Sequence, residues 1–243
     1  MNTVIGLLII AIGAFCQSSG YLPINPFRKC SWESYWLIQG VFAWLIFPIF
    51  VALFAVPQGH GLFELYAAAP KESFLTMFFG VLWGVGGLTF GLSMRYLGVA
   101  LGQSIALGTC AGLGTIMGPV LLNIFFPELD ALSSLTAAVI IGVVTTLAGI
   151  AIIGIAGGMK SASLSEEEKK EAVKDFNFPK GLAIALLAGF MSGCFNVGLE
   201  FGKELNFGEL TDPMFRTLPA TLLVTVGGFL TNACYCIFQN VRN

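Results

Sequence analysis

The polar side chains best placed for chemistry in this chain lie in the apolar segment 180–202. Ser192, Asn196 and Glu200 recur there every fourth residue, so they share one face of a helix. Glu200 is the only acid well inside an apolar stretch. A carboxylate at low dielectric has a raised pKa, which allows proton exchange near neutral pH. The pattern predicts a proton-exchanging carboxyl beside neutral hydrogen-bonding groups. A glutamate solvated at the helix end, or paired with Lys203, is the alternative.

Gln17 and Gln103 also stand inside apolar segments, and their neutral amides both donate and accept hydrogen bonds. Together with Asn196 they suit an uncharged, hydroxylated ligand, because a strongly charged ligand would require buried counter-charges and few exist here. Trp83 offers a flat apolar wall beside such a ligand, with interface anchoring or plain packing as the alternative. These residues are therefore predicted to bind a neutral solute.

The composition places these residues in a membrane. Hydrophobic residues make up 56% of the 243 residues, charged residues only 11%, and the mean hydropathy is +0.84. A soluble domain has about 25% charged residues, so most of this chain cannot face water. We predict an all-α membrane protein, a multi-span helical bundle. Spanning helices need about 20 apolar residues, and seven segments qualify: 3–24, 34–57, 73–94, 98–125, 132–158, 180–202 and 216–239.

The sequence gives little support for enzymatic or metal chemistry. One histidine, His60, and six cysteines in mostly apolar surroundings provide no Cys/His cluster for a metal ion. The sequence contains no HExxH motif, no apparent buried acid pair and no glycine-rich phosphate loop with a lysine. We therefore expect no catalytic residue, no metal, no cofactor and no nucleic-acid partner.

Lysine and arginine are distributed unequally between the two sides of the predicted bundle. Cytoplasmic loops carry the excess of positive charge, so the odd-numbered connections face the cytoplasm. The N-terminus then lies outside the inner membrane of a bacterial-type cell. The cytoplasmic side holds nine residues (Arg28, Lys29, Arg95, Lys160, Lys169, Lys170, Lys174, Lys180 and Arg242), against three on the other (Lys71, Lys203 and Arg216).

Two charged residues at span ends are candidates for a gate. Glu33 begins the second span and Arg95 ends the third, both on the predicted cytoplasmic side. An ion pair of Glu33 with Arg95 or Arg28 would close the inner mouth of the bundle. Capping of the helix C-terminus and setting of the topology are the alternative roles for Arg95.

Glycines recur at helical spacing in the third and fourth spans. A stripe of five lies on the third span, and two small-xxx-small pairs lie on the fourth. Such residues let helix backbones approach closely in lipid, so they predict helix–helix seams along which helices also slide or rock. Proline inside a span predicts a kink. The residues are Gly80, Gly84, Gly87, Gly91 and Gly98, the pairs Gly108/Gly112 and Gly114/Gly118, and Pro48, Pro119 and Pro219.

The charged stretch 159–179 divides the chain into a five-span first part, 1–158, and a two-span second part, 180–243. Ser165 and Glu168 have the form of a capping box, so this cytoplasmic linker is predicted to contain a short solvated helix. Residues 6–21 align with 181–196. Because five spans precede the second part, its first span crosses the membrane in the opposite direction to the first span of the chain. This pattern predicts inverted five-helix repeats. The second repeat is incomplete here, which suggests a partial chain or a homodimer whose protomers complete one another.

Three stretches resemble the L-rhamnose–proton symporters of the drug/metabolite transporter superfamily. They are NPFRKCSWESYW, FGVLWGVGGLTFGLSMRYLGVALGQSIALG and FPKGLAIALLAGFMSG. The most specific part covers Trp83, Gly84, Gly86, Gly91 and Met94 to Gly98. Phe90 stands where the pattern has a tyrosine, and the family's last three spans have no counterpart.

The resemblance implies ten spans in two inverted five-helix repeats around a central cavity, with proton-driven uptake of L-rhamnose or a related deoxy sugar. It adds Gly84 and Gly86 to Trp83 as expected substrate-binding residues. Another transporter of the superfamily, exporting metabolites or drugs, is the alternative. Replacement of Gln17, Gln103 or Asn196 by leucine should abolish sugar uptake, whereas an exporter should tolerate these changes and depend on its aromatic residues.

Overall fold

The computed structural model describes residues 3–19, 31–165 and 175–242, and the described chain is helical with no strand. The all-α fold is therefore confirmed. The elements are α1 (Thr3–Ser19), α2 (Trp32–Gly40), η2 (Val41–Ile46), α3 (Phe47–Ala52), η3 (Leu53–Ala55), α4 (Leu62–Ala68), α5 (Pro70–Leu97), α6 (Val99–Phe125), η4 (Pro127–Leu129), η5 (Ala131–Ser134), α7 (Ala137–Ser163), α9 (Phe178–Phe201), η6 (Gly208–Leu210) and α10 (Leu218–Arg242).

Six helical stretches of the described chain are long and apolar enough to cross a membrane. They confirm six of the seven predicted spans, from the second to the last: Glu33–Ala55, Pro70–Leu97, Ala100–Phe125, Ala137–Lys160, Phe178–Phe201 and Leu218–Arg242. The first predicted span, 3–24, is a shorter apolar helix over Val4–Cys16, and residues 20–24 lie outside the described chain. The predicted linker helix falls mostly on 166–174, also outside it.

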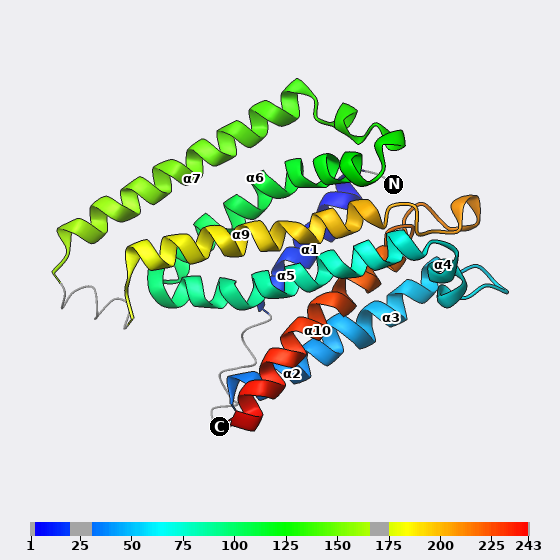
Figure 1. Ribbon diagram of the computed structural model, residues 1–243, viewed down its shortest axis with the longest axis horizontal. Coiled ribbons are helices and arrows are strands. Elements are labelled where there is room, and N and C mark those ends of the chain that lie inside the picture. Colours follow the sequence, from blue (N-terminus) through cyan, green and yellow to red (C-terminus); the bar gives the residue numbers. More distant parts are fainter. Residues whose placement is uncertain (1–2, 20–30, 166–174, 243) are drawn as a thin grey trace.

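Helix α9 lies at the centre of the bundle, between α5 and α6 (Figure 1). Helix α10 packs against the other side of α5 and is accompanied by α2, η2 and α3, whereas α7 packs mainly on α6 at the periphery. Large apolar side chains on α1, α3 and α7 are exposed, as expected for surfaces solvated by lipid tails. The best-packed part of the molecule is therefore the group α5, α6, α9 and α10.

The glycine stripe on α5 forms a seam over only part of its length. A Cβ at Gly80 would lie 2.8 Å from the Cα atom of Val224 on α10, and one at Gly84 would lie 2.8 Å from the carbonyl oxygen of Gly228. Nothing lies within 4 Å of the same position at Gly87 or Gly91. The prediction was wrong for these two because α10 diverges from α5 beyond Gly84.

The two glycine pairs on α6 form seams as predicted, with different partners. Gly108 and Gly112 face aliphatic side chains of α7, whereas Gly114 and Gly118 face α9. Gly98 has φ +80°, between the end of α5 and the start of α6. A left-handed conformation of this kind favours glycine, so Gly98 makes the sharp corner between the two spans.

The three span prolines occupy different positions in their helices. Pro48 follows the π-helical segment η2, where the Phe47 N–H donates to the Phe42 carbonyl five residues back. Because proline lacks an N–H and clashes with the carbonyl four residues back, the wider turn accommodates it. Pro119 lies inside α6, whereas Pro219 is the second residue of α10 and causes no mid-span kink there.

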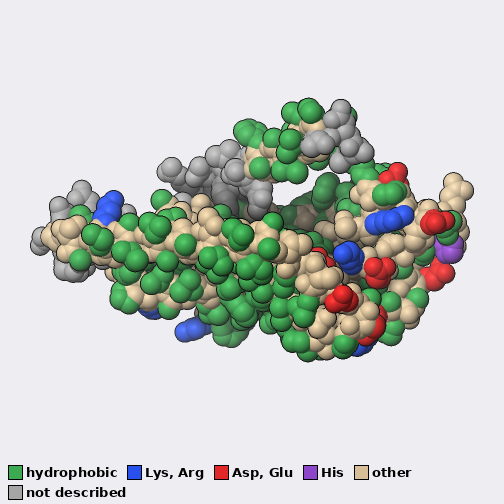
Figure 2. All heavy atoms as spheres, turned by 90° about the horizontal axis from the view of Figure 1, so that it is seen from above, with side chains coloured by type: hydrophobic (Ala, Val, Ile, Leu, Met, Phe, Trp, Pro, Cys, Tyr) green, Lys and Arg blue, Asp and Glu red, His purple; other side chains and the backbone are tan. Residues whose placement is uncertain are grey.

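The bundle has two ends of different charge. Arg95, Lys160, Lys180 and Arg242 lie at or near helix ends that share one end, called here the basic end. Among the described residues, most of the acids lie in or beside the connections at the opposite end, and Figure 2 shows acidic side chains gathered there. We call it the acidic end, and Glu72, Glu128 and Glu204 belong to it. Which end faces the cytoplasm stays a prediction from the charge count.

Candidate functional site

A polar cavity of about 350 Å³ lies toward the acidic end, between α6, α9 and the start of α7. Its volume is at the lower limit for small-molecule sites, which are typically about 300–1,000 Å³. Two predicted residues, Asn196 and Glu200, lie together in its wall. The lining residues are Gly114, Thr115, Pro119, Ser134, Leu135, Val139, Asn196, Leu199 and Glu200.

The hydrogen-bonding groups of this cavity are available to a ligand. The Asn196 side chain is exposed, and its amide has no hydrogen-bond partner within the described part of the chain. Thr115 Oγ1 donates to the Ala111 carbonyl at 2.7 Å, and Ser134 Oγ donates to the Ala131 carbonyl at 2.7 Å. Both hydroxyl oxygens therefore keep lone pairs that can accept. An amide, a carboxylate and two hydroxyls suit a hydroxylated neutral molecule.

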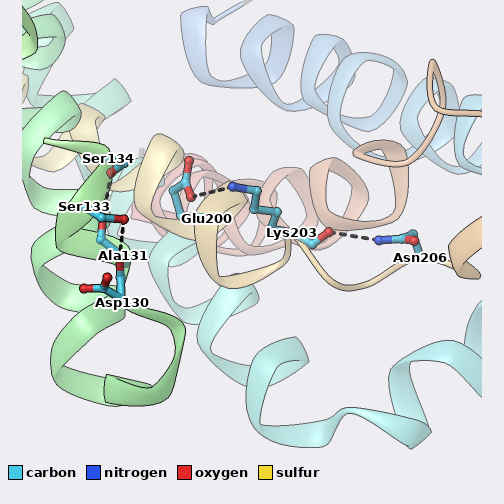
Figure 3. A network of polar contacts seen from close by, with 7 residues as sticks. All are labelled: Asp130, Ala131, Ser133, Ser134, Glu200, Lys203 and Asn206. Atoms are coloured by element: carbon cyan, nitrogen blue, oxygen red, sulfur yellow. Dashed lines mark hydrogen bonds and ion pairs between the residues drawn. The ribbon is translucent and has the colours of Figure 1, made fainter. Parts of the chain in front are cut away.

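Glu200 stands between two cavities. Besides the polar cavity it lines a second one of about 240 Å³ at the acidic end, with Glu72, Glu128 and Lys203 among its neighbours. Lys203 Nζ lies 3.9 Å from Glu200 Oε2, and the two side chains extend toward one another (Figure 3). Glu200 and Lys203 thus form the ion pair that the sequence offers as the alternative role of Glu200. The structure adds that this carboxylate is reachable from both cavities, and its role in proton coupling stays a prediction.

Ser192 does not join Asn196 and Glu200 in the polar cavity. It faces α5 instead, where a Cβ at Gly86 would lie 2.8 Å from Ser192 Oγ. Four residues advance a helix by about 400°, so each step of four rotates the side chain by about 40°. Over eight residues this drift separates Ser192 from Glu200, and the predicted shared face holds only for its last two members.

The predicted residues of α5 lie at helix contacts away from the polar cavity. Gly84 faces Thr231 and Gly228 on α10, and Gly86 faces α9. The Trp83 ring is half-buried and makes edge contacts with Trp44, at a centroid distance of 5.8 Å, and with Phe195 at 5.0 Å. Trp83 thus joins three elements, η2, α5 and α9.

A buried asparagine outside the predicted site residues, Asn232, connects this aromatic cluster to α10. Asn232 is 4% exposed, accepts a hydrogen bond from Trp36 Nε1 at 2.9 Å and donates to the Gly228 and Gly84 carbonyls at 2.8 and 3.3 Å. Trp36 in turn lies 5.5 Å from Trp44 between ring centroids. The sequence signal for this contact was the presence of a polar side chain, Asn232, within an apolar span.

The two remaining amides lie apart from the polar cavity or outside the described side chains. Gln103 is on the first turns of α6 near the basic end, and its Nε2 lies 3.6 Å from Met94 Sδ. Gln17 is part of α1, but its side chain lies outside the described residues. The structure therefore brings together two of the predicted substrate and proton residues, Asn196 and Glu200.

At the basic end Arg95 pairs with Asp175, with Arg95 Nε 2.7 Å from Asp175 Oδ2. The Asn177 N–H donates to the Tyr96 carbonyl at 3.1 Å, and Lys180 Nζ donates to the Tyr96 hydroxyl at 2.9 Å. These contacts fasten the start of α9 to the end of α5.

The gate predicted from Glu33 has a different geometry in the structure. No ion pair joins Glu33 to Arg95 among the described residues, and Arg28 lies outside them. Asp175 is 80 positions from Arg95 in the chain, so residue spacing gave no signal for their pair. A gating role for Glu33 and Arg95 stays a prediction.

Comparison with known proteins gives one consistent result. The family model described as "L-rhamnose-proton symport protein (RhaT)" matches residues 1–243. The chain is 33% identical over 238 residues to the L-rhamnose-proton symporter of Cronobacter sakazakii (strain ATCC BAA-894), covering 96% of this chain and 66% of that protein. It is 29% identical over 244 residues to the symporter of Yersinia pestis bv. Antiqua (strain Antiqua), covering 97% and 67%. The chain thus spans about two thirds of the length of these relatives. No solved structure matches it.

Proposed function

We propose that this chain, which belongs to the L-rhamnose-proton symport protein family, acts in secondary active transport. It takes up L-rhamnose or a related deoxy sugar with protons across the inner membrane. The observation that carries this proposal is the family match along the whole chain. The polar cavity supports it independently, since its neutral groups and size suit one hydroxylated ring.

In this proposal Asn196 binds sugar hydroxyls. A primary amide donates two hydrogen bonds and accepts others, so it can meet adjacent hydroxyls of a pyranose. Trp83 and Gln103 stay proposed as further substrate contacts, met at other stages of transport because they lie away from this cavity. Gln17, whose side chain lies outside the described residues, stays proposed as a substrate contact as well.

Glu200 is the proposed proton carrier. It lines the cavity at the acidic end as well as the polar cavity, so a proton arriving from outside reaches the carboxylate without crossing the sugar. Protonation removes the charge that attracts Lys203 and leaves a neutral carboxyl that can donate to a sugar hydroxyl. Sugar binding and proton binding then favour one another at a single side chain.

The Arg95–Asp175 pair is the proposed lock at the inner end. It joins the end of α5 to the segment before α9, where the two parts of the chain meet. Glu33 is the proposed alternative partner of Arg95 when this contact opens.

The proposal is tested by uptake of labelled L-rhamnose into cells expressing the protein, with and without a protonophore. We expect accumulation that collapses with the proton gradient and is lost in Asn196→Leu. Glu200→Gln should lose accumulation but retain exchange of labelled for unlabelled sugar, because exchange needs no net proton movement. Thr145→Val, on the exposed face of α7, is the matched control and should transport normally.

Two results would contradict the proposal. Absence of rhamnose uptake, with the protein shown to be in the membrane, would refute the substrate and favour export of another metabolite. Undiminished accumulation by Glu200→Gln would refute Glu200 as the proton carrier.

A further inference from the structure

We propose that Gly114 and Gly118 are positioning residues of the polar cavity. They place no side chain of their own against Asn196 and Glu200, so that the Asn196 amide and the Glu200 carboxylate stand where one sugar ring meets both. This inference rests on the proposed function, because it assigns roles toward the same sugar and proton. It assigns the pair a role in the site, whereas the spacing of the two glycines alone predicts only a helix–helix seam.

Gly118 lies directly behind Glu200. A Cβ at Gly118 would lie 3.1 Å from Glu200 Cγ, tighter than ordinary van der Waals contact. Cγ is the carbon next to the carboxyl group, so it cannot give way without moving the carboxylate. A methyl group at 118 would therefore displace the proton-carrying group relative to both cavities.

Gly114 holds the second polar group in the same way. It lines the cavity, and a Cβ there would lie 3.0 Å from Asn196 Nδ2 and 3.3 Å from the Cα atom of Gly193. Gly193 belongs to α9, and a Cβ on it would lie 3.2 Å from the Gly114 Cα atom. The two backbones touch here, so a methyl group at 114 would displace the Asn196 amide and also press on the α9 backbone at Gly193.

The other glycine pair of α6 provides an internal comparison. Gly108 and Gly112 have the same spacing but face α7, where a Cβ would meet Ile150 Cγ1 at 2.7 Å and Leu147 Cδ2 at 2.9 Å. These neighbours are aliphatic side chains of α7, so an added methyl group would disturb the packing there and touch no group of the site, because neither lines the polar cavity. Identical substitutions at the two pairs therefore separate an effect on the site from an effect on packing.

The cavity also limits the ligand. At about 350 Å³ it is at the small end of the usual range for ligand sites, and its wall at Gly114 carries no side chain. A single six-membered ring bearing hydroxyls fits this description, whereas an oligosaccharide does not. Methyl groups at 114 or 118 would reduce the room or move the polar groups.

The test measures labelled L-rhamnose uptake by Gly114→Ala and Gly118→Ala, with Gly108→Ala and Gly112→Ala as controls, at equal amounts of protein in the membrane. We expect Gly114→Ala to raise the half-saturating sugar concentration about fivefold to tenfold, as for loss of one hydrogen bond. Gly118→Ala should lower proton-driven accumulation and shift its pH dependence. The controls should behave as the unsubstituted protein. Equal losses at both pairs, or no loss at 114 and 118, would overturn the proposal.

A second measurement does not depend on rhamnose. Asn196→Cys is labelled from outside with a membrane-impermeant maleimide, and peptide mass spectrometry locates the label. We expect the labelling rate to change when Gly114→Ala is added and to stay unchanged when Gly112→Ala is added. An identical rate in both backgrounds would overturn the positioning role. Absence of rhamnose uptake by the unsubstituted protein would refute the proposed function, and the labelling result alone would then decide the positioning role.

Discussion

Two glycines of one sequence stripe should respond oppositely to the same substitution. At Gly80 an added Cβ would lie 2.8 Å from the Cα atom and 2.9 Å from the carbonyl carbon of Val224, whereas at Gly87 nothing lies within 4 Å. Ordinary contact begins at 3.4 Å. Because the obstacles at Gly80 are backbone atoms, no rotamer change relieves them, and α5 and α10 must separate by roughly half an ångström or more.

The magnitude follows from two opposing terms. Overpacking of a tight interface costs about 1–3 kcal/mol and occasionally more, and replacing glycine by alanine inside a helix gains about 1 kcal/mol. Gly80→Ala should therefore lower the free energy of unfolding by up to about 2 kcal/mol. Gly87→Ala should leave it unchanged or raise it by up to about 1 kcal/mol.

The assay is thermal unfolding of the purified protein in detergent, followed by tryptophan fluorescence at one heating rate. The difference between the two variants is the overpacking term of about 1–3 kcal/mol, which corresponds to roughly 2–12 °C for a chain of this size. Gly91→Ala, also without neighbours within 4 Å, is the matched control for Gly87→Ala. Midpoints that agree within the scatter of the control would refute the reasoning, because they would mean that α10 does not contact α5 at Gly80.

Three further predictions concern polar contacts. A double-mutant cycle of Trp36→Phe and Asn232→Leu, read from unfolding midpoints, should give a coupling of about 1 kcal/mol; additive effects would show that the 2.9 Å bond contributes nothing. Arg95→Asp and Asp175→Arg should each change the unfolding midpoint little, because both side chains are substantially exposed; a large loss in either variant that the swapped double variant restores would contradict this. Burial raises the pKa of Tyr66 above its ordinary 10.0, so the folded state holds the phenolic proton more tightly than the unfolded state. Stability should therefore fall as pH rises above about 10, less so in Tyr66→Phe, and equal pH dependence would refute the assignment.

Much of this fold follows from apolar length and helical periodicity. Six spans and the two glycine pairs of α6 were predictable, because each depends on local spacing or composition. Asn196 and Glu200 were found for the same reason, since residues four apart stay close to one face. The corner at Gly98 was not predicted, since its spacing assigned it to the stripe.

The remaining features depend on which helices become neighbours. Gly84 and Gly87 belong to one stripe, yet only Gly84 meets α10, because the helices diverge. Asp175 reaches Arg95 across 80 positions, and Ser134 enters the polar cavity from a short 3₁₀ turn. None of these partners is encoded in the spacing of the residues themselves.

The π-helical turn at Val41–Ile46 amounts to one residue inserted into an otherwise regular span. One residue corresponds to about 100° of rotation about the helix axis. The side chains of α2, before this turn, are therefore rotated by about that angle relative to those of α3, compared with a regular helix. Deleting a single residue there would remove the wide turn that accommodates Pro48 and would turn Trp36 away from Asn232. In a related sequence, a one-residue gap in this stretch would therefore predict a rearranged contact between the second span and α10, even where every other residue is identical.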